Sequence, residues 1–188
     1  MSRRSIGKQW RPAIVGLLLM TVICGVVYTG VVTGLAQLFF PHQAEGSFVT
    51  VTLKDGTTRT YGSALIAQEF TEQRYLIGRP PGVSTLSPTS DQQAAAVNQR
   101  VAWWHSFDPA NSAPIPLDLV TESGSGVDPH ISPAAAEYQV DRIAAARGVT
   151  PDDVRAIIEQ HTSGRFLWLF GDPAVDVLQV NLALDGLL

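Results

Sequence analysis

A long apolar run at the front of the chain is its clearest pattern. No residue from Pro12 to Pro41 carries a charge, and a helix needs about 20 apolar residues to cross the hydrocarbon core of a membrane. The pattern predicts one transmembrane helix, which we assign to residues 12–36. This helix divides the chain into a short N-terminal segment, 1–11, and a large domain, 37–188.

The charges that flank the run indicate its orientation. After the run come nine basic and seventeen acidic residues, whereas only basic residues precede it: Arg3, Arg4, Lys8 and Arg11. Basic segments stay on the cytoplasmic side, so we expect a single-pass protein of the cell (inner or plasma) membrane with a cytoplasmic N-terminus and an extracytoplasmic main domain. A cleaved signal peptide is the alternative, and SRRSIGK at 2–8 resembles a twin-arginine signal. The run is, however, longer than the ~7–15 apolar residues of such a signal.

Strand-like and helix-like patterns follow one another after the run. Residues 48–62 alternate apolar and polar positions on both sides of Asp55-Gly56, which predicts a β-hairpin with a type I′ turn. We expect a short helix over 63–70, capped by Ser63, and then a surface loop over 78–90. A longer helix is expected over 91–106, with a core-facing side made of Ala94, Val97, Val101 and Trp104.

The second half of the domain is predicted in the same way. After a loop over 108–116, residues 117–121 favour a short strand or extended segment. Ser132-Pro133 and Gly148 are typical of the start and the end of a helix, whose buried side would be Ala136, Val140, Ile143 and Ala144. Thr150-Pro151 starts another helix, with Val154, Ile157, Ile158 and His161 on one side. Residues 165–170 and 175–180 favour strands, so the fold class is α+β: one mixed domain behind one transmembrane helix.

Composition excludes some classes of function. The excess of acidic residues beyond the apolar run argues against nucleic acid as a partner. The only cysteine, Cys24, lies inside the apolar run, so the domain contains no disulfide bond and depends on its core for stability.

The stretch 123–148, SGSGVDPHISPAAAEYQVDRIAAARG, contains the residues with the most obvious chemistry. Asp128 and His130 resemble a general base with an orienting carboxylate, or the beginning of a metal site. A metal site would need more ligands, and His42, His105 and His161 are not at ligand-like spacings. The glycines and serines match a nucleophile loop only loosely. A membrane-anchored or secreted hydrolase that uses Asp128 and His130 is therefore the alternative function, while the preferred prediction has no catalytic residue and no metal.

Two nucleotide-dependent classes are excluded by missing motifs. The chain contains no GxxxxGK[ST] phosphate-binding loop, and it lacks the Asp-Lys-Thr-Gly sequence on which P-type pumps are phosphorylated. It is therefore not the ATP-hydrolysing subunit of such a pump.

Small residues recur along the apolar run. Such rows let two membrane helices approach closely, so we expect a partner helix to pack on this side. The residues concerned are Thr21, Gly25, Thr29, Gly30, Thr33 and Gly34.

Several motifs, in the same order, resemble the C subunit of the Kdp potassium-transporting ATPases, KdpC, along almost the whole chain. The central one is 116–121 followed by SGSGVDPHISPAAA, and the others lie at 40–47, 62–70, 75–80 and 171–185. The chain departs from the family pattern at several positions: the loop over 83–92 is shorter, and Thr29 stands where a proline is common.

This resemblance implies a function. Members of the family are non-catalytic subunits of a high-affinity, ATP-driven potassium uptake complex, needed for its assembly and described as catalytic chaperones that raise the ATP affinity of another subunit. The implied partners are a channel-like potassium-binding subunit, an ATP-hydrolysing P-type subunit and a small single-helix subunit. ATP is thus implied for the complex only, and no cofactor is expected on this chain. The candidate residues for docking on a partner are Asp128, His130, Gln139 and Arg142.

Overall fold

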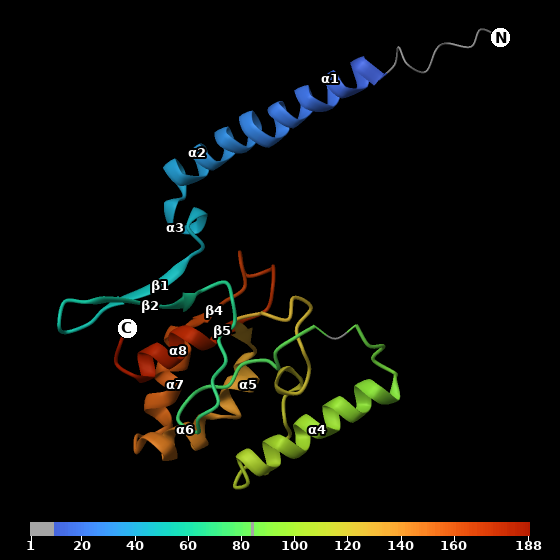
Figure 1. The fold of residues 1–188 in the computed structure, drawn as a ribbon. Coiled ribbons are helices and arrows are strands. Elements are labelled where there is room, and N and C mark those ends of the chain that lie inside the picture. Colours follow the sequence, from blue (N-terminus) through green and yellow to red (C-terminus); the bar gives the residue numbers. More distant parts are fainter. Residues whose placement is uncertain (1–9, 84) are drawn as a thin grey trace. The chain divides into compact units, whose positions relative to one another are not determined.

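The computed structural model describes residues 10–83 and 85–188 and divides them into two compact units, one ending at Ser47 and the other spanning Phe48–Leu188. The two units are considered separately. Figure 1 gives the order of the helices and strands along the chain.

The first unit is dominated by one apolar helix of 30 residues, Trp10–Phe39. It consists of α1 (Trp10–Thr21), a π-helical segment (Val22–Tyr28) and α2 (Thr29–Phe39), and the short α3 (Pro41–Ala44) follows it. The hydroxyl of Thr29 donates a hydrogen bond to the carbonyl of Cys24 at 3.0 Å, five residues earlier. At a rise of 1.5 Å per residue the helix is about 45 Å long, more than the ~30 Å hydrocarbon core of a membrane requires. By length and composition, it is able to span a membrane.

The second unit begins with a two-stranded hairpin of β1 (Phe48–Thr52) and β2 (Thr58–Ser63). The predicted hairpin is confirmed, but its turn is of another type. Of the two central residues Asp55 and Gly56, only Gly56 has a positive φ, of 82°. The Asp55 carboxylate instead accepts hydrogen bonds from the backbone N–H of Thr57 at 2.9 Å and from its hydroxyl at 2.6 Å.

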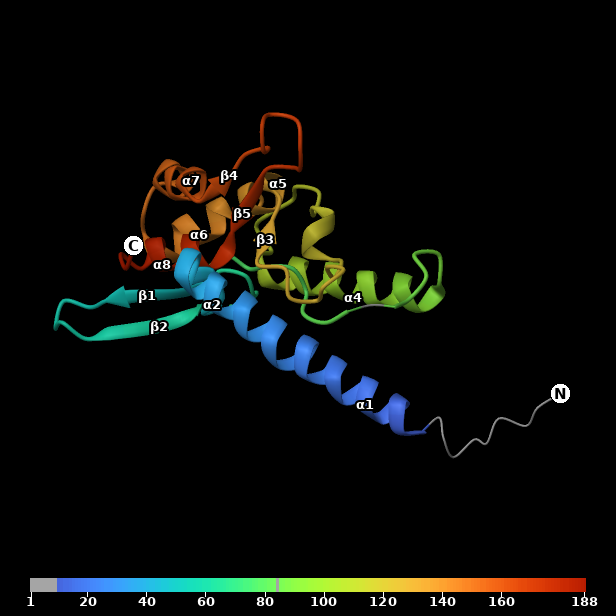
Figure 2. The same ribbon diagram turned by 90° about the horizontal axis from the view of Figure 1, so that it is seen from above.

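A second small sheet lies inside the domain. Its strands are β3 (His130–Ile131), β5 (Ala174–Asp176) and β4 (Thr162–Ser163), in that order, and both pairings are antiparallel. The helices α5 (Pro133–Glu137), α6 (Val140–Arg147), α7 (Pro151–Gln160) and α8 (Val177–Leu184) gather beside it. The N-terminal end of the long helix α4 (Asp91–Phe107) extends away from this group, as both views show (Figures 1 and 2).

The hydrophobic core joins α4 to the other helices. The Trp104 side chain is almost fully buried, and its indole N–H donates to the carbonyl of Leu119 at 3.0 Å. The predicted core-facing sides of α6 and α7 are largely confirmed, because Val140, Ile143 and Val154 are fully buried. Ala94, however, is exposed, so the core-facing side of α4 is narrower than predicted. The remaining large buried residues of this core include Leu76, Leu119, Ile131, Tyr138, Ile158, Val175 and Val180.

The predicted starts and ends of the helices in the second half of the domain are confirmed, but the helix expected between Ser132 and Gly148 is interrupted: residues 138–139 form a turn that divides it into α5 and α6. Ser132 caps α5 and accepts from the N–H of Ala135 at 3.2 Å. Thr150 and Asp153 form a reciprocal capping box at the start of α7. Gly148 ends α6 in the left-handed conformation, with φ 68° and ψ 32°.

Four predicted elements are wrong. No helix forms over 63–70, where Ser63 Oγ does accept from the N–H of Leu65 at 3.1 Å but the chain then bends so that the Ala67 N–H donates to the Val127 carbonyl at 2.8 Å. Residues Leu117–Leu119 form a 3₁₀ turn instead of a strand. Residues 165–170 form an exposed turn, and most of 175–180 belongs to α8.

Candidate functional site: a hydrogen-bonded loop and the pocket behind it

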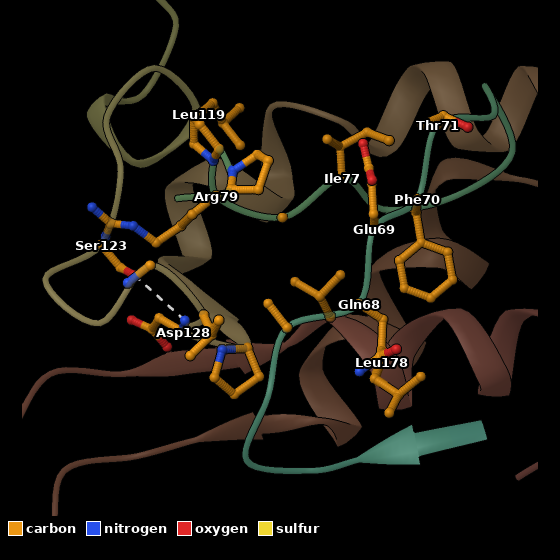
Figure 3. A pocket seen from close by; sticks show the side chains of 18 of the residues that line it. Gln68, Glu69, Phe70, Thr71, Ile77, Arg79, Leu119, Ser123, Asp128 and Leu178 are labelled. Carbon is orange, nitrogen blue, oxygen red and sulfur yellow. Dashed lines mark hydrogen bonds between the residues drawn. The ribbon is translucent and has the colours of Figure 1, made fainter. Parts of the chain in front are cut away.

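The serine hydroxyls of the loop at 123–130 bind the loop's own backbone. Ser123 Oγ accepts from the N–H of Gly126 at 2.8 Å and from that of Asp128 at 3.4 Å, the latter drawn as a dashed line in Figure 3. Ser125 Oγ accepts from the N–H of Val127 at 3.3 Å. These bonds satisfy backbone donors that no helix or strand uses, and they give the loop a defined shape.

Asp128 and His130 lie together at the end of this loop. Asp128 Oδ1 accepts from the backbone N–H of His130 at 3.0 Å and lies 3.3 Å from His130 Nδ1. Both side chains are partly exposed, at 38% and 42%. The backbone of His130 is held in β3, opposite Asp176 of β5. The pair therefore presents a carboxylate and an imidazole to solvent from a fixed position.

The geometry gives no support to the hydrolase alternative. Within the described residues, His130 makes no hydrogen bond to a serine hydroxyl, so a base and a nucleophile are not paired as covalent catalysis requires. The described part of the chain also contains no group of three or more metal-ligating side chains.

Gln139 is buried, and its amide is used inside the domain. The residue has no exposed surface. Its Oε1 accepts from the N–H of Ile77 at 2.8 Å, and its Nε2 donates to the carbonyl of Ile77 at 3.0 Å. The Asn181 side chain bonds the backbone of Leu76, the residue before Ile77, in the same way. Its Oδ1 accepts from the N–H of Leu76 at 2.7 Å, and its Nδ2 donates to the carbonyl of Leu76 at 2.9 Å. We call these two side chains the amide clamp.

Arg142 is also an internal residue. Its guanidinium donates to the carbonyls of Gln73 and Tyr75 and to Gln139 Oε1, the last two at 3.1 and 2.7 Å. It also lies over the ring of Phe107, 4.9 Å from the centroid. Burial lowers the pKa of Arg142 to about 10, so the group stays protonated at neutral pH. Of the four predicted docking residues, Gln139 and Arg142 are therefore buried and stabilise the domain, whereas Asp128 and His130 are partly exposed. Docking on a partner stays a prediction, and we retain it for Asp128 and His130.

A largely apolar pocket of about 430 Å³ lies behind the loop. Figure 3 shows Phe70, Ile77 and Leu178 at one part of its wall and Arg79, Ser123 and Asp128 at another. The segment 67–81, the C-terminal half of α4, the loop at 119–129 and the start of α8 all contribute to the lining.

Two arginines that line this pocket hold its edge together. Arg79 Nη2 donates to the carbonyl of Glu122 at 3.0 Å, and Arg100 Nη1 donates to the carbonyl of Val120 at 2.9 Å. Arg100 also forms an ion pair with the Glu122 carboxylate. The hydrogen bond from Arg100 is the largest cause that lowers the pKa of Glu122. The sequence analysis did not predict these roles of Arg79, Arg100 and Glu122, because three charged residues spread over 43 positions form no recognisable pattern. Only Arg79 lies within one of the family motifs.

The predicted small-residue row lies on the long apolar helix. All of its members from Thr21 to Gly34 are exposed in the single chain, and an added Cβ on Gly25, Gly30 or Gly34 would meet nothing within 4 Å. The Thr21 hydroxyl donates to the carbonyl of Leu17 at 2.9 Å. The hydroxyls of Thr21 and Thr29 are thus bonded within the helix, and the packing of the row on a partner helix stays a prediction.

Comparison with known proteins gives a consistent result over nearly the full length. The family described as "KdpC: K+-transporting ATPase, c chain" matches residues 10–186. A relative from Listeria monocytogenes, named potassium-transporting ATPase KdpC subunit, is 56% identical over 181 residues, which are 95% of both chains. Proteins of the same name from Sorangium cellulosum and Clostridium perfringens are 48% and 44% identical, over 94% and 95% of this chain and 96% and 97% of their own. Since the match includes both the apolar helix and the domain, the chain belongs to the KdpC family of K+-transporting ATPase c chains.

Proposed function

We propose that this chain is a non-catalytic accessory subunit of a potassium-transporting P-type ATPase complex. The observation that carries the proposal is the family match over residues 10–186, which includes the helix and the domain as one unit. The Listeria relative is itself named as a subunit of a potassium-transporting ATPase. The chain's own contribution is then assembly and contact with the other subunits.

The proposed arrangement has the helix in the membrane, the N-terminus in the cytoplasm and the domain outside. The helix packs through its small residues on a membrane helix of a partner, and the domain docks on the channel-like potassium-binding subunit through the surface around Asp128 and His130. The ATP-hydrolysing subunit and the small single-helix subunit complete the complex. Because ATP is cytoplasmic, an effect on ATP affinity acts across the membrane, through the relative stability of two states of the complex.

The first experiment tests assembly through the helix. A tagged chain is co-expressed with the other subunits and purified in a mild detergent. We expect the parent to retain its partners and the double variant Gly30→Leu/Gly34→Leu to lose most of them, because the added side chains keep the partner helix at a distance. Gly16→Leu is the matched control, since a Cβ at Gly16 also meets nothing within the chain. Isolation of the parent chain alone, without any subunit of the pump, would refute the proposal.

The second experiment tests the docking loop and the catalytic chaperone role. The double variant Asp128→Ala/His130→Ala is compared with Asp141→Ala/His105→Ala, which removes the same two side-chain types at other exposed positions. In the purified complex we expect the first variant alone to raise the KM for ATP in potassium-stimulated hydrolysis, with kcat less affected. An intact complex with an unchanged KM in both variants would exclude this loop as the coupling surface.

A further inference from the structure

The turn between β4 and β5 exposes five consecutive large apolar side chains. Their exposed fractions run from 59% for Phe170 to 93% for Trp168. The turn projects away from the helices and the small sheet in both views (Figures 1 and 2). We call residues 166–170 the apolar turn. Contiguous exposed apolar surface of this kind marks an interaction site in soluble domains.

The backbone of the apolar turn is strained at two of its apolar residues. Leu167 and Trp168 both have positive φ, of 51° and 63°, and the Leu169 N–H donates to the Phe166 carbonyl at 3.2 Å. A hairpin turn with positive φ at both central positions favours Asn-Gly. Leucine and tryptophan at these positions cost backbone energy and are not buried within the domain. We therefore expect their side chains to contact something outside the domain.

Four of the five backbone N–H groups of the apolar turn, all but that of Leu167, donate hydrogen bonds to carbonyls of residues 165–170. The N–H of Phe166 donates to the Phe170 carbonyl at 2.8 Å, and the N–H of Phe170 donates back at 2.9 Å. The Trp168 N–H donates to the Arg165 carbonyl at 3.2 Å. Transfer into an apolar medium is costly for unpaired backbone groups, so these bonds lower the free-energy cost of moving the turn into such a medium.

Two charged residues at the base of the turn limit how deeply it could enter an apolar medium. Arg165 and Asp172 form an ion pair at 3.0 Å, and their side chains are 52% and 87% exposed. No charged residue lies between them. An apolar tip with a tryptophan above a charged base is the arrangement found at the boundary between lipid and water.

The chain's own anchor keeps the domain close to that boundary. Only residues 40–47 separate the long apolar helix from β1, and even a fully extended segment of this length reaches at most about 28 Å. A domain of this size has a radius of gyration of about 14 Å, so some part of its surface is always near the lipid.

We propose that the apolar turn inserts into the lipid–water interface of the membrane that holds the chain's helix. All five side chains are exposed in succession, which suits a fluid medium that surrounds the turn better than a protein groove that contacts one side of it. The domain is acidic, so the attraction is apolar and does not require anionic lipid. This inference rests on the anchoring of the chain by Trp10–Phe39 and does not depend on which complex the chain joins.

The test uses the full chain in lipid nanodiscs with a single environment-sensitive fluorophore. In a Cys24→Ala background, which removes the only cysteine, the probe is attached at Leu169→Cys in the turn or at Lys54→Cys in the exposed turn of the β1–β2 hairpin. Lipids that carry a quencher in the upper acyl chain should quench the probe at 169 several-fold more than the probe at 54. Equal quenching at the two positions would overturn the proposal.

A second variant separates membrane contact from folding. Leu167→Asn/Trp168→Gly supplies the residues that the backbone conformation favours, so the turn should keep its shape and the protein its melting temperature. Quenching at 169 should fall to the level at 54. Persistent quenching would contradict an insertion driven by these side chains. Shielding of the probe at 169 only when partner subunits are present, without lipid quenching, would assign the turn to a protein contact and also overturn the proposal.

Discussion

The amide clamp allows a quantitative test of what holds the domain together. Leu76 is fully buried in a segment that belongs to no sheet, and both polar groups of its backbone are bonded to the Asn181 side chain. The substitution Asn181→Leu keeps the branched shape and the number of heavy atoms of the side chain but removes both bonds. The N–H and the carbonyl of Leu76 would then be buried without these partners.

The cost follows from the number of groups left unpaired. A buried donor or acceptor without a partner costs about 1–3 kcal/mol, so two of them cost roughly 2–6 kcal/mol. The greater apolarity of leucine offsets a part, and we expect a net loss of about 3 kcal/mol in the free energy of unfolding. For a domain of this size 1 kcal/mol corresponds to roughly 3 °C in Tm, which gives a decrease of about 10 °C.

The assay is thermal unfolding of the full chain in detergent, followed by near-ultraviolet circular dichroism. The buried Trp104 reports on the core. Asn98→Leu is the matched control, because it makes the same change at an exposed position of another helix, α4. The control should melt within a few degrees of the parent. If Asn181→Leu melts as high as Asn98→Leu, the hydrogen bonds to Leu76 are not what stabilises this segment.

Three further predictions use the same measurement. Desolvation alone would raise the pKa of Asp185, but hydrogen bonds from Arg147 and Tyr75 and the charges of Arg147 and Arg74 outweigh it and lower the pKa. Asp185→Asn should therefore destabilise the domain at pH 7, and the difference in Tm from the parent should disappear as the pH falls through this lowered pKa and the carboxylate of the parent becomes protonated. A difference that persists in acid would rule out this ionic origin. Gly126→Ala should be strongly destabilising, since an added Cβ would lie 2.8 Å from the backbone of Gly82, whereas Gly124→Ala, with open space around it, should be neutral; equal melting of the two would be inconsistent with the close approach. Thr150→Ala should cost about 1 kcal/mol, and an unchanged Tm would mean that the capping box at α7 is dispensable.

Sequence patterns predicted the elements that depend on neighbouring residues. The caps at Ser132, Gly148 and Thr150 and the long helix α4 require only local spacing, and they are confirmed. One local signal was overlooked. Asp176 accepts from the N–H of Gln179 at 2.9 Å, and an acidic residue three positions before a glutamine is typical of a helix start, so the start of α8 could have been found.

Other errors have a tertiary cause. The segment at 63–70 has a serine in a capping position, but a backbone bond from Ala67 to Val127 holds it in an irregular path. Gln139 was predicted to contact a partner, but it is fully buried. Its partner, Ile77, lies 62 positions away, and nothing in the local pattern indicates a buried backbone that needs an amide. Asp128 and His130 are partly exposed, as a docking role requires, and this role stays a prediction.

The amide clamp also has a consequence for the order of biogenesis. Asn181 bonds a residue 105 positions earlier, and the nearby Asp185 bonds Arg74 and Tyr75, 111 and 110 positions earlier. A ribosome releases the earlier segment long before these two residues exist, and non-local pairings of this kind form slowly. The nascent domain must therefore wait, with its centre incomplete, until α8 has been synthesised.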